Sequence, residues 1–317
     1  MKNILVIGAT GQIGSELTMA LRQKYGDSRV IAGGHSKSPS AILRDSGPFV
    51  IADCLDSQGI TDIIKKYKID TIYHLAALLS ATAEQKPDLA WQVNLQGLIN
   101  ILNISRIYKC AVFFPSSIGV FGPSTPKVNT PQDTVQRPST MYGITKLTGE
   151  LLCDYYFKRY ELDVRGVRFP GLISYETLPG GGTTDYAVEI FYEAISQKHY
   201  TCPLKEKTYL DMMYMPDAIK ASIQIMETDS SRLIHRNGYN VTAMSFCPKD
   251  LVEEIKNWIP DFTIDYEIDP LKQSIADSWP DSMDDSAARN EWDWSPEYDL
   301  AKMTEDMIKQ LKEKIKK

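Results

Sequence analysis

The glycine-rich segment after the first apolar run is the feature that most constrains the fold of this sequence. Residues 4–7 read Ile-Leu-Val-Ile, and residues 8–14 read Gly-Ala-Thr-Gly-Gln-Ile-Gly, directly before an amphipathic stretch. Glycines between a strand and a helix permit a tight turn and a close approach of the backbone to a pyrophosphate. The helix N-terminus then offers free N–H groups and a partial positive charge to phosphates. We therefore predict a dinucleotide site that includes Gly8, Gly11, Gln12, Ile13 and Gly14.

Short apolar runs alternate with longer amphipathic stretches through the first half of the chain. This alternation is typical of a parallel sheet covered by helices on both faces. The sequence predicts strands at residues 4–7, 30–32, 49–52, 71–74, 111–115 and 164–169. It predicts helices at residues 12–25, 57–67, 87–108 and 142–159. We therefore expect an α/β fold with a doubly wound parallel sheet of the Rossmann type.

The sequence changes in texture after Pro170. Pro179 and the glycines at 180–182 mark a loop, and a helix is predicted at residues 185–197. Shorter pieces follow at residues 238–241, 249–259 and 262–267, with a charged helix from about residue 299. We predict a nucleotide-binding domain of residues 1–170 plus about 214–242. A smaller α/β substrate-binding lobe is predicted from residues 171–213 and 243–317.

Composition argues against several classes of protein. The 35 Lys and Arg residues against 41 Asp and Glu give a net charge of -6, which argues against a nucleic-acid partner. No segment approaches the ~18 uncharged apolar residues of a membrane helix, and the N-terminal apolar run is too short for a signal peptide. The five cysteines and four histidines are scattered, which indicates reduced thiols and no metal site. We therefore expect a cytoplasmic protein.

The segment after the second predicted strand bears on the choice of cofactor. An acid about twenty residues after the last glycine usually holds the adenosine ribose. Here no carboxylate occurs between Asp27 and Asp45, and Gly34 stands in that region. The sequence favours NAD and leaves NADP open, with Lys37 either near a 2′-phosphate or incidental on a surface loop. Asp53 is expected to accept a hydrogen bond from the adenine amine or to cap the following helix.

Tyr142 and Lys146 lie at positions i and i+4 of a predicted helix, on one face. A neighbouring ammonium stabilises a phenolate and lowers the pKa of the phenol from its usual ~10. Such a pair can accept the proton of an alcohol while hydride leaves the same carbon. Ser117 follows the strand at residues 111–115, at the edge where parallel sheets bind ligands. We therefore predict a metal-independent NAD(P) oxidoreductase in which Ser117 holds the substrate oxygen.

These motifs together resemble the extended short-chain dehydrogenase/reductases, a group that includes nucleotide-sugar epimerases. The matching residues are Gly8–Gly14, Asp53, His74–Ala77, Asn94, Ser117, Tyr142, Lys146 and Arg168–Gly171. The resemblance implies that Leu75, Ala76 and Ala77 back the cofactor, that Pro170 lines the nicotinamide, and that Ser117, Tyr142 and Lys146 form the catalytic triad. Asn94 is expected either to relay a proton through water beside the cofactor or to be an ordinary helix-surface residue.

Several other segments resemble the L-threonine 3-dehydrogenases of this superfamily. They are residues 78–84, 179–188, 212–215, 240–246 and 275–280. The resemblance implies oxidation of L-threonine to L-2-amino-3-oxobutyrate with hydride transfer to NAD, in threonine catabolism toward glycine. It implies a substrate site of Ser80, Ser117, Tyr142, Gly182, Thr183, Thr184 and Trp279. At Gly34 the sequence departs from that family, which typically has an aspartate there.

The substrate end of this site has a plainer interpretation as well. The hydroxyl groups of Thr183 and Thr184, with N–H groups of the glycine loop, could bind a carboxylate, and Trp279 could close over it. Glycines beside a pocket also suggest a loop that becomes ordered on binding. In the plainer interpretation the glycines form a flexible loop and Trp279 belongs to the core.

Two other functions fit part of the pattern. A nucleotide-sugar epimerase or dehydratase needs a lobe that grips a diphosphate, for which the later half offers Arg165, Arg168, Arg232 and Arg236. A non-catalytic, cofactor-sensing protein would keep the fold, but the intact serine, tyrosine and lysine argue against it. We also expect a homodimer, because the helices that begin near residues 87 and 142 could pair across a two-fold axis.

Overall fold

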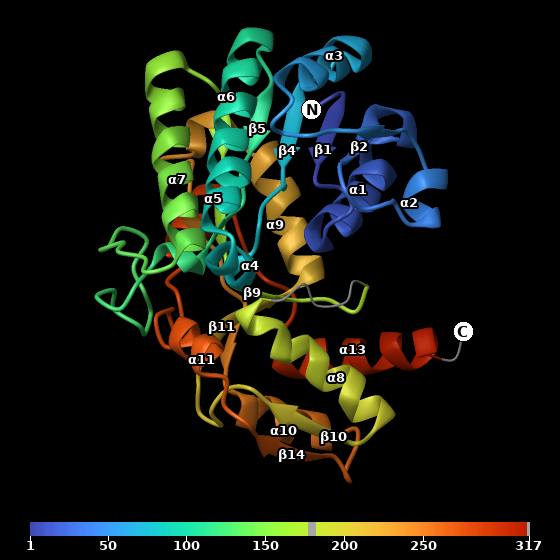
Figure 1. Ribbon diagram of the computed structural model, residues 1–317, viewed down its shortest axis with the longest axis vertical. Coiled ribbons are helices and arrows are strands. Elements are labelled where there is room, and N and C mark those ends of the chain that lie inside the picture. The colour runs from blue at the N-terminus through green and yellow to red at the C-terminus, as the bar shows by residue number, and fades with distance from the viewer. Residues whose placement is uncertain (177–181, 316–317) are drawn as a thin grey trace.

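The computed structural model describes residues 1–176 and 182–315 (Figure 1). Its centre is a six-stranded parallel sheet in the order β3-β2-β1-β4-β5-β7. The strands are β1 (Ile4–Ile7), β2 (Val30–Gly34), β3 (Phe49–Ile51), β4 (Thr71–His74), β5 (Ala111–Phe113) and β7 (Val164–Arg165). The strand order reverses between β1 and β4, as in a doubly wound sheet. The predicted α/β fold class is therefore confirmed.

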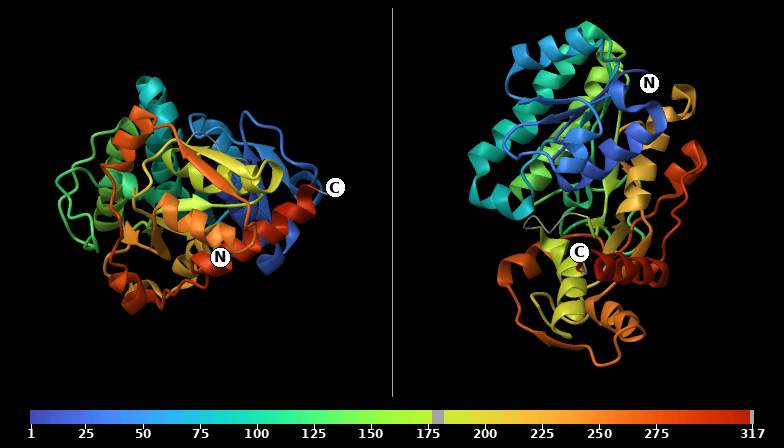
Figure 2. Two further views of the ribbon diagram at one scale, coloured as in Figure 1. Left: turned by 90° about the horizontal axis from the view of Figure 1, so that it is seen from below. Right: turned by 90° about the vertical axis from the view of Figure 1, so that its right-hand side faces the viewer.

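Helices cover both faces of this sheet, as the two views of Figure 2 show. On one face lie α3 (Ser57–Tyr67), α6 (Gly97–Tyr108) and α7 (Met141–Tyr160). On the other face lie α1 (Gln12–Tyr25), α9 (Met215–Glu227) and α12 (Ser286–Trp292). Each face has its own apolar core, so the central strands are buried on both sides. This explains why they read as continuous apolar runs in the sequence.

The glycines of the first turn meet a strict spatial demand. Gly8 has a φ of +89°, a region that favours glycine. A Cβ atom on Gly14 would lie 2.1 Å from the Gly8 carbonyl oxygen, so α1 can approach β1 only if residue 14 has no side chain. The N–H groups of Gly8 and Ala9 donate to the Gly33 carbonyl at 2.9 Å each, which fixes the turn on β2.

Helix α3 shows why local sequence predicted many elements well. Ile60, Ile63 and Ile64 share the buried face, at the i, i+3 and i+4 spacing of an amphipathic helix. The carboxylate of Asp56 accepts a hydrogen bond from Gly59 N at 3.0 Å and caps the N-terminus. The helix ends at Lys68, which has a left-handed conformation with a φ of 53°.

Several predicted elements are divided in the structure, and the long helix predicted at residues 87–108 is one. It consists of α5 (Pro87–Ala90), a π-helical turn over Trp91–Gln96, and α6. Hydrophobic periodicity does not distinguish a π-helical turn from α-helix, so the sequence pattern could not reveal it. The short helices α2 (Ala41–Asp45) and α4 (Ser80–Gln85) were not predicted at all.

Two predicted strands are also divided. Residues 111–115 form β5, and the chain then enters β6 (Ser116–Ser117) of a separate sheet. Residues 164–169 form β7 and β8 (Val167–Phe169), separated at Gly166, where a Cβ atom would lie 2.4 Å from the Phe114 carbonyl oxygen. The second sheet has the order β12-β8-β6, with β12 (Tyr239–Asn240).

The lobe below the main sheet has its own core (Figure 1). Its strands are β9 (Gly171–Ile173), β10 (His199–Cys202), β11 (Leu210–Tyr214), β13 (Met244–Phe246) and β14 (Thr263–Tyr266). Its helices are α8 (Tyr186–Ser196), α10 (Pro248–Lys256), α11 (Pro270–Ala276) and α13 (Leu300–Ile315). Strand β11 pairs with β9 and β13, and β10 pairs with β14.

Short 3₁₀ turns occur in both halves of the chain, at Asp27–Arg29, Ile118–Val120, Thr183–Asp185 and Ser230–Arg232.

The chain returns to the nucleotide-binding half after β11. Helix α9 joins the apolar core that also holds α1, and β12 pairs with β8. We therefore propose the same division that the sequence predicts. Residues 1–170 and about 214–242 form one domain, and residues 171–213 and 243–317 form the lobe.

A buried ion pair ties this second sheet to α7. The guanidinium of Arg168 donates to both carboxylate oxygens of Glu150, with NH2 to Oε2 at 2.9 Å, and both side chains are 6% exposed. Arg168 also donates to the Gln132 carbonyl at 2.9 Å and to Asn240 Oδ1 at 3.1 Å. The hydroxyl of Ser116 donates to the same carboxylate. One network thus holds β6, β8, β12 and α7 together next to Ser117.

Substitution Arg168→Met tests this network. It leaves the Glu150 carboxylate buried without its cation, and we expect the free energy of unfolding to fall by about 3–5 kcal/mol. Arg232→Met, which breaks an exposed pair with Asp293, should lower the free energy of unfolding far less, because water screens exposed charges. Urea unfolding of both variants measures the difference. An equal loss of unfolding free energy in the two variants would contradict a stabilising role for the buried network.

Candidate active site

A cavity of about 140 Å³ opens at the carboxyl edge of the main sheet, where the lobe meets the nucleotide-binding domain. Thirteen residues that the sequence singled out line it: Gln12, Ile13, Leu75, Ala77, Ser80, Ser117, Tyr142, Lys146, Pro170, Gly182, Thr183, Thr184 and Trp279. The structure thus brings the predicted catalytic and substrate residues together with part of the predicted cofactor site. Gly8, Gly11, Gly14, Asp53, Ala76 and Asn94 are not among its lining residues.

The residues beside the cavity fit a dinucleotide. Helix α1 begins with Gly11 at its N-cap, which makes no side-chain cap, and its first turn has no acidic residue. Its first N–H groups and the positive end of its dipole are therefore open to a phosphate. The segment after β4 passes close by, since a Cβ atom on Gly8 would lie 2.9 Å from Ala76 N. These backbone approaches leave room for a pyrophosphate but not for larger side chains.

Close packing at the start of α7 places Tyr142 beside Ser117. The hydroxyl of Thr140 accepts a hydrogen bond from Gly143 N at 3.1 Å and caps the helix. A Cβ atom on Gly143 would lie 2.1 Å from the Gly119 carbonyl oxygen, so only glycine lets α7 approach the turn after Ser117. The sequence motif Tyr-x-x-x-Lys did not indicate this role of Gly143, because the motif specifies only the tyrosine and the lysine.

Lys146 is buried one turn further along α7. Its Nζ donates to the Pro115 carbonyl at 2.7 Å and lies 4.8 Å from the Phe114 ring centroid and 5.7 Å from the Tyr142 ring centroid. Burial lowers the pKa of Lys146 to about 8. Burial also raises the pKa of Tyr142, and a hydrogen bond with Ser117 offsets part of that effect. The pKa of Tyr142 is therefore raised, which is opposite to the lowering that the sequence predicts.

Asn94 is a buried link between three segments rather than a surface residue, so the surface interpretation is wrong. It is 3% exposed and lies in the π-helical turn before α6. Its Oδ1 accepts from Leu78 N at 2.7 Å, and its Nδ2 donates to the Leu78 carbonyl at 3.1 Å and to Thr145 Oγ1 at 3.2 Å. Thr145 in turn donates to the Tyr142 carbonyl at 2.9 Å. Asn94 thus ties the wall of the cavity to the helix of the catalytic pair.

Asp53 does not cap α3, so that interpretation is wrong too. Asp56 is the cap, and Asp53 Oδ1 instead accepts from Leu55 N at 2.9 Å. The other carboxylate oxygen of Asp53 lies 3.6 Å from Nε2 of His35. The side chain remains one-third exposed at the end of β3, so contact with an adenine stays a prediction.

The substrate end of the cavity includes polar groups that local hydrogen bonds leave available. Ser80 begins α4 and Thr183 begins a 3₁₀ turn, and they are 4% and 2% exposed. Thr183 Oγ1 has no hydrogen-bond partner among the described residues, which is costly for a buried hydroxyl unless a ligand or water meets it. Trp279 is 5% exposed and reaches the same cavity. Residues 180 and 181 of the predicted loop lie outside the described residues.

Sequence reasoning missed one charged residue of this site. Asp185 is the only carboxylate among the described residues that line the cavity. It is 8% exposed, and its Oδ2 accepts a hydrogen bond from Gly182 N at 2.6 Å. In the sequence, Asp185 stands at the start of a predicted helix, where an acid is common because it interacts favourably with the helix dipole. Its position therefore gave no indication that it lines the cavity.

Comparison with known proteins agrees with this geometry. The model of the NAD dependent epimerase/dehydratase family matches residues 4–241. The chain belongs to this family. A Staphylococcus aureus protein called an uncharacterized epimerase/dehydratase is 52% identical over 99% of this chain and 98% of its own length. The structure of an L-threonine dehydrogenase from Clostridium difficile is 55% identical, with a TM-score of 0.97, over 99% of this chain and 98% of that one. A monomeric L-threonine 3-dehydrogenase from a metagenome is 46% identical, with a TM-score of 0.93, over 98% and 99%.

Epimerases and dehydratases of this family that act on nucleotide sugars must hold a diphosphate, and the arginines suggested for that task are engaged elsewhere. Arg165 and Arg236 pair with Asp163, Arg168 with Glu150, and Arg232 with Asp293. None of the four lines the cavity. Lys146 is the only Lys or Arg among the described lining residues.

Among residues 1–176 and 182–315, no group of three or more His, Cys, Asp or Glu side chains is placed to hold a metal ion. Within the same ranges no helix is long and apolar enough to span a membrane. All five cysteines are free and buried. His74, at the end of β4, has no partner for either ring nitrogen among the described residues, and burial and the Lys146 charge lower its pKa to about 3.

Substitution Lys146→Met tests the buried charge. The pKa of this amine is about 8 in the folded chain against 10.5 when exposed, so between these pH values the unfolded chain binds more protons. Wild-type stability should therefore rise with pH across this window. We expect the free energy of unfolding of wild type minus variant to increase by about 3 kcal/mol from pH 8 to pH 10.5. Urea titrations at both pH values measure it, and an unchanged difference would contradict the lowered pKa.

Proposed function

We propose that this protein is a metal-independent L-threonine 3-dehydrogenase that oxidises L-threonine to L-2-amino-3-oxobutyrate with NAD. The observation that carries the proposal is the charge in the cavity. Among the described residues that line it there are one lysine, one carboxylate, threonine and serine hydroxyls, and no arginine. A small amino acid needs such a set, whereas a nucleotide sugar needs cations for its diphosphate. The likeness to L-threonine dehydrogenases over nearly the whole chain supports the same substrate.

The catalytic steps follow from the side chains in the cavity. Ser117 holds the substrate hydroxyl beside Tyr142, and Tyr142 accepts its proton as hydride leaves the β-carbon. A bound nicotinamide would supply the hydride acceptor. Lys146 supplies a positive charge beside the Tyr142 ring and remains fixed by the Pro115 carbonyl.

The rest of the cavity can orient the amino acid. Thr183 Oγ1, which has no other partner among the described residues, is placed to donate to the substrate carboxylate, with Thr184 and Ser80 nearby. Asp185 supplies negative charge for the ammonium group while its Oδ2 also holds Gly182 N. Trp279 covers the site with a buried indole and limits the size of the substrate.

Substitution Tyr142→Phe tests the proton acceptor. The variant keeps the ring and loses the hydroxyl, so we expect kcat with L-threonine to fall roughly 10²–10⁴-fold. Binding of NADH, measured separately by fluorescence titration, should remain. Tyr209→Phe, the same change at an exposed tyrosine that does not line the cavity, serves as a control and should leave kcat unchanged. Near-normal turnover of Tyr142→Phe would rule out the assigned role.

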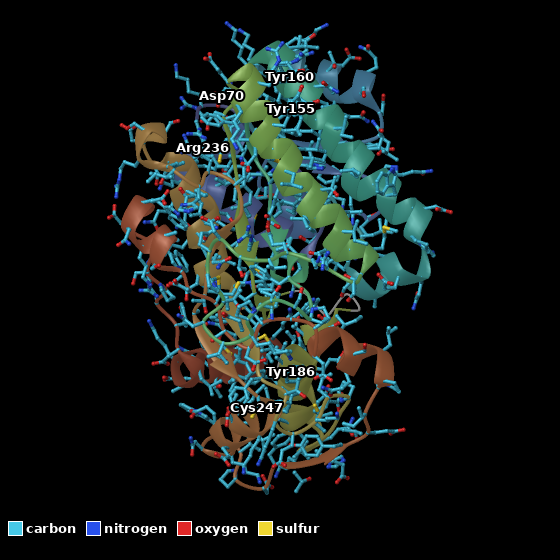
Figure 3. The ribbon with its side chains drawn as sticks, turned by 90° about the vertical axis from the view of Figure 1, so that its left-hand side faces the viewer. Asp70, Tyr155, Tyr160, Tyr186, Arg236 and Cys247 are labelled. Atoms are coloured by element: carbon cyan, nitrogen blue, oxygen red, sulfur yellow. The ribbon has the colours of Figure 1, made fainter. Side chains whose placement is uncertain are left out.

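We also propose a homodimer formed through the helices α5, α6 and α7. Figure 3 shows α7 along the front of the molecule, with Tyr155 and Tyr160 near its end. Leu151 and Tyr155 on α7 are 62% and 51% exposed, and Trp91, in the turn between α5 and α6, is 49% exposed, as expected of side chains that another subunit covers.

We further propose that the protein acts in the cytoplasm. Its five cysteines are free and buried, which is typical of proteins in a reducing compartment.

Substitution Leu151→Arg tests the dimer. A charge at the centre of an apolar interface should dissociate it, so we expect the variant to be monomeric when the wild type is dimeric. Ile234→Arg, at a site 80% exposed and away from these helices, is the matched control and should stay dimeric. Light scattering after size-exclusion chromatography gives the masses. A monomeric wild type would overturn the proposal and place the chain with its monomeric relative.

A further inference from the structure

The corner of the cofactor site at the end of β2 lacks the usual group that holds an adenosine ribose. Gly34 is the last residue of β2, where an acid commonly accepts hydrogen bonds from the ribose. A Cβ atom on Gly34 would lie 2.8 Å from Cζ of Phe49 and 3.0 Å from Cγ2 of Thr10. The phenyl ring and the methyl group have thus closed over the position from which that acid would project. Figure 1 shows this corner where β2 meets α1 and α2.

The loop at this corner carries basic side chains and no acid. The segment between Asp27 and Asp45 has no carboxylate, and its loop after β2 carries His35 and Lys37, both exposed. The acid on the neighbouring strand end, Asp53, lies 3.6 Å from the His35 imidazole, through Oδ2 to Nε2. The carboxylate of Asp53 therefore faces a basic side chain.

Space for an additional group opens beside the same corner. A cavity of about 600 Å³ is lined by Thr10 and by the serines at positions 38 and 40. Two acids, Glu16 and Glu176, line its other side. Glu16 accepts a hydrogen bond from Ser174 Oγ at 2.6 Å, and burial raises its pKa to about 7, so near neutral pH it is charged only part of the time. Thr10, whose methyl group lies beside Gly34, joins this cavity to the corner at the end of β2.

We propose that this cofactor site accepts NADP as well as NAD, with the 2′-phosphate facing His35 and Lys37. An acid at the end of β2 would reject the phosphate by like charge, and here both that acid and its hydrogen bonds to the ribose are missing. The two basic side chains attract the phosphate instead. The proposal rests on the nicotinamide cofactor of the proposed function but not on the identity of its substrate.

Direct binding tests this proposal without turnover. Isothermal titration calorimetry of the full chain with NADH and with NADPH, in the absence of any amino acid, gives the two dissociation constants. For the wild type we expect them to agree within about tenfold. Gly34→Asp restores the acid, and its Cβ displaces the tip of the Phe49 ring and the Thr10 methyl group. It should raise the ratio of the NADPH to the NADH constant at least about tenfold.

Lys37→Ala provides a second test that does not depend on how well Gly34→Asp folds. It should weaken NADPH binding about fivefold more than NADH binding, because only NADPH carries the 2′-phosphate. Lys66→Ala, an exposed lysine on α3, is the matched control and should change neither constant.

Three results would overturn the proposal: wild-type NADH binding more than about a hundredfold tighter than NADPH binding, an equal effect of Lys37→Ala on both cofactors, or no binding of either. A protein that fails to oxidise L-threonine would still give these constants. The failure of the proposed substrate and the failure of dual cofactor binding are therefore distinguishable.

Discussion

The structure depends on two places where a helix backbone packs directly against the backbone of a neighbouring turn, which only glycine permits. Helix α1 can approach β1 only because Gly14 presents no side chain to the Gly8 carbonyl. Helix α7 can approach the turn after Ser117 only because Gly143 presents none to the Gly119 carbonyl. The first contact opens a helix N-terminus to phosphate, and the second sets Tyr142 beside Ser117. Both close approaches thus depend on glycines rather than on the reactive side chains.

The proposed catalytic groups lie in an environment that opposes their charge. Burial lowers the pKa of Lys146 and raises the pKa of Tyr142, so it disfavours the charged form of both groups. A positively charged nicotinamide is the partner that would favour the phenolate when it is needed. The buried Arg168–Glu150 pair and the Asn94 amide hold the surrounding strands and helices in place. These buried polar contacts cost some stability, and they keep the polar groups around the cavity fixed and away from water.

The sequence predicted the parts of the molecule in which one physical demand selects one pattern. Continuous apolar runs predicted the central strands, and the glycines at 8, 11 and 14 predicted the first turn. The motif residues Ser117, Tyr142 and Lys146 do line one cavity. The π-helical turn at Asn94, the break at Gly166 and the place of Asp185 in the cavity could not be predicted in this way. Each is set by segments distant in the sequence, and each looks locally like an ordinary helix or strand.

The central claim is that the cavity binds a small amino acid and removes hydride from its β-carbon. Initial rates of NADH formation by the purified protein with L-threonine, compared with D-threonine and with a uridine diphosphate sugar, test it most directly. We expect rapid reduction of NAD with L-threonine and little with its enantiomer, because in the proposed site Thr183 and Asp185 would hold the carboxylate and ammonium groups in one orientation. No reduction of NAD or NADP with L-threonine, together with epimerisation of the nucleotide sugar, would contradict the claim and return the chain to the sugar chemistry of its family.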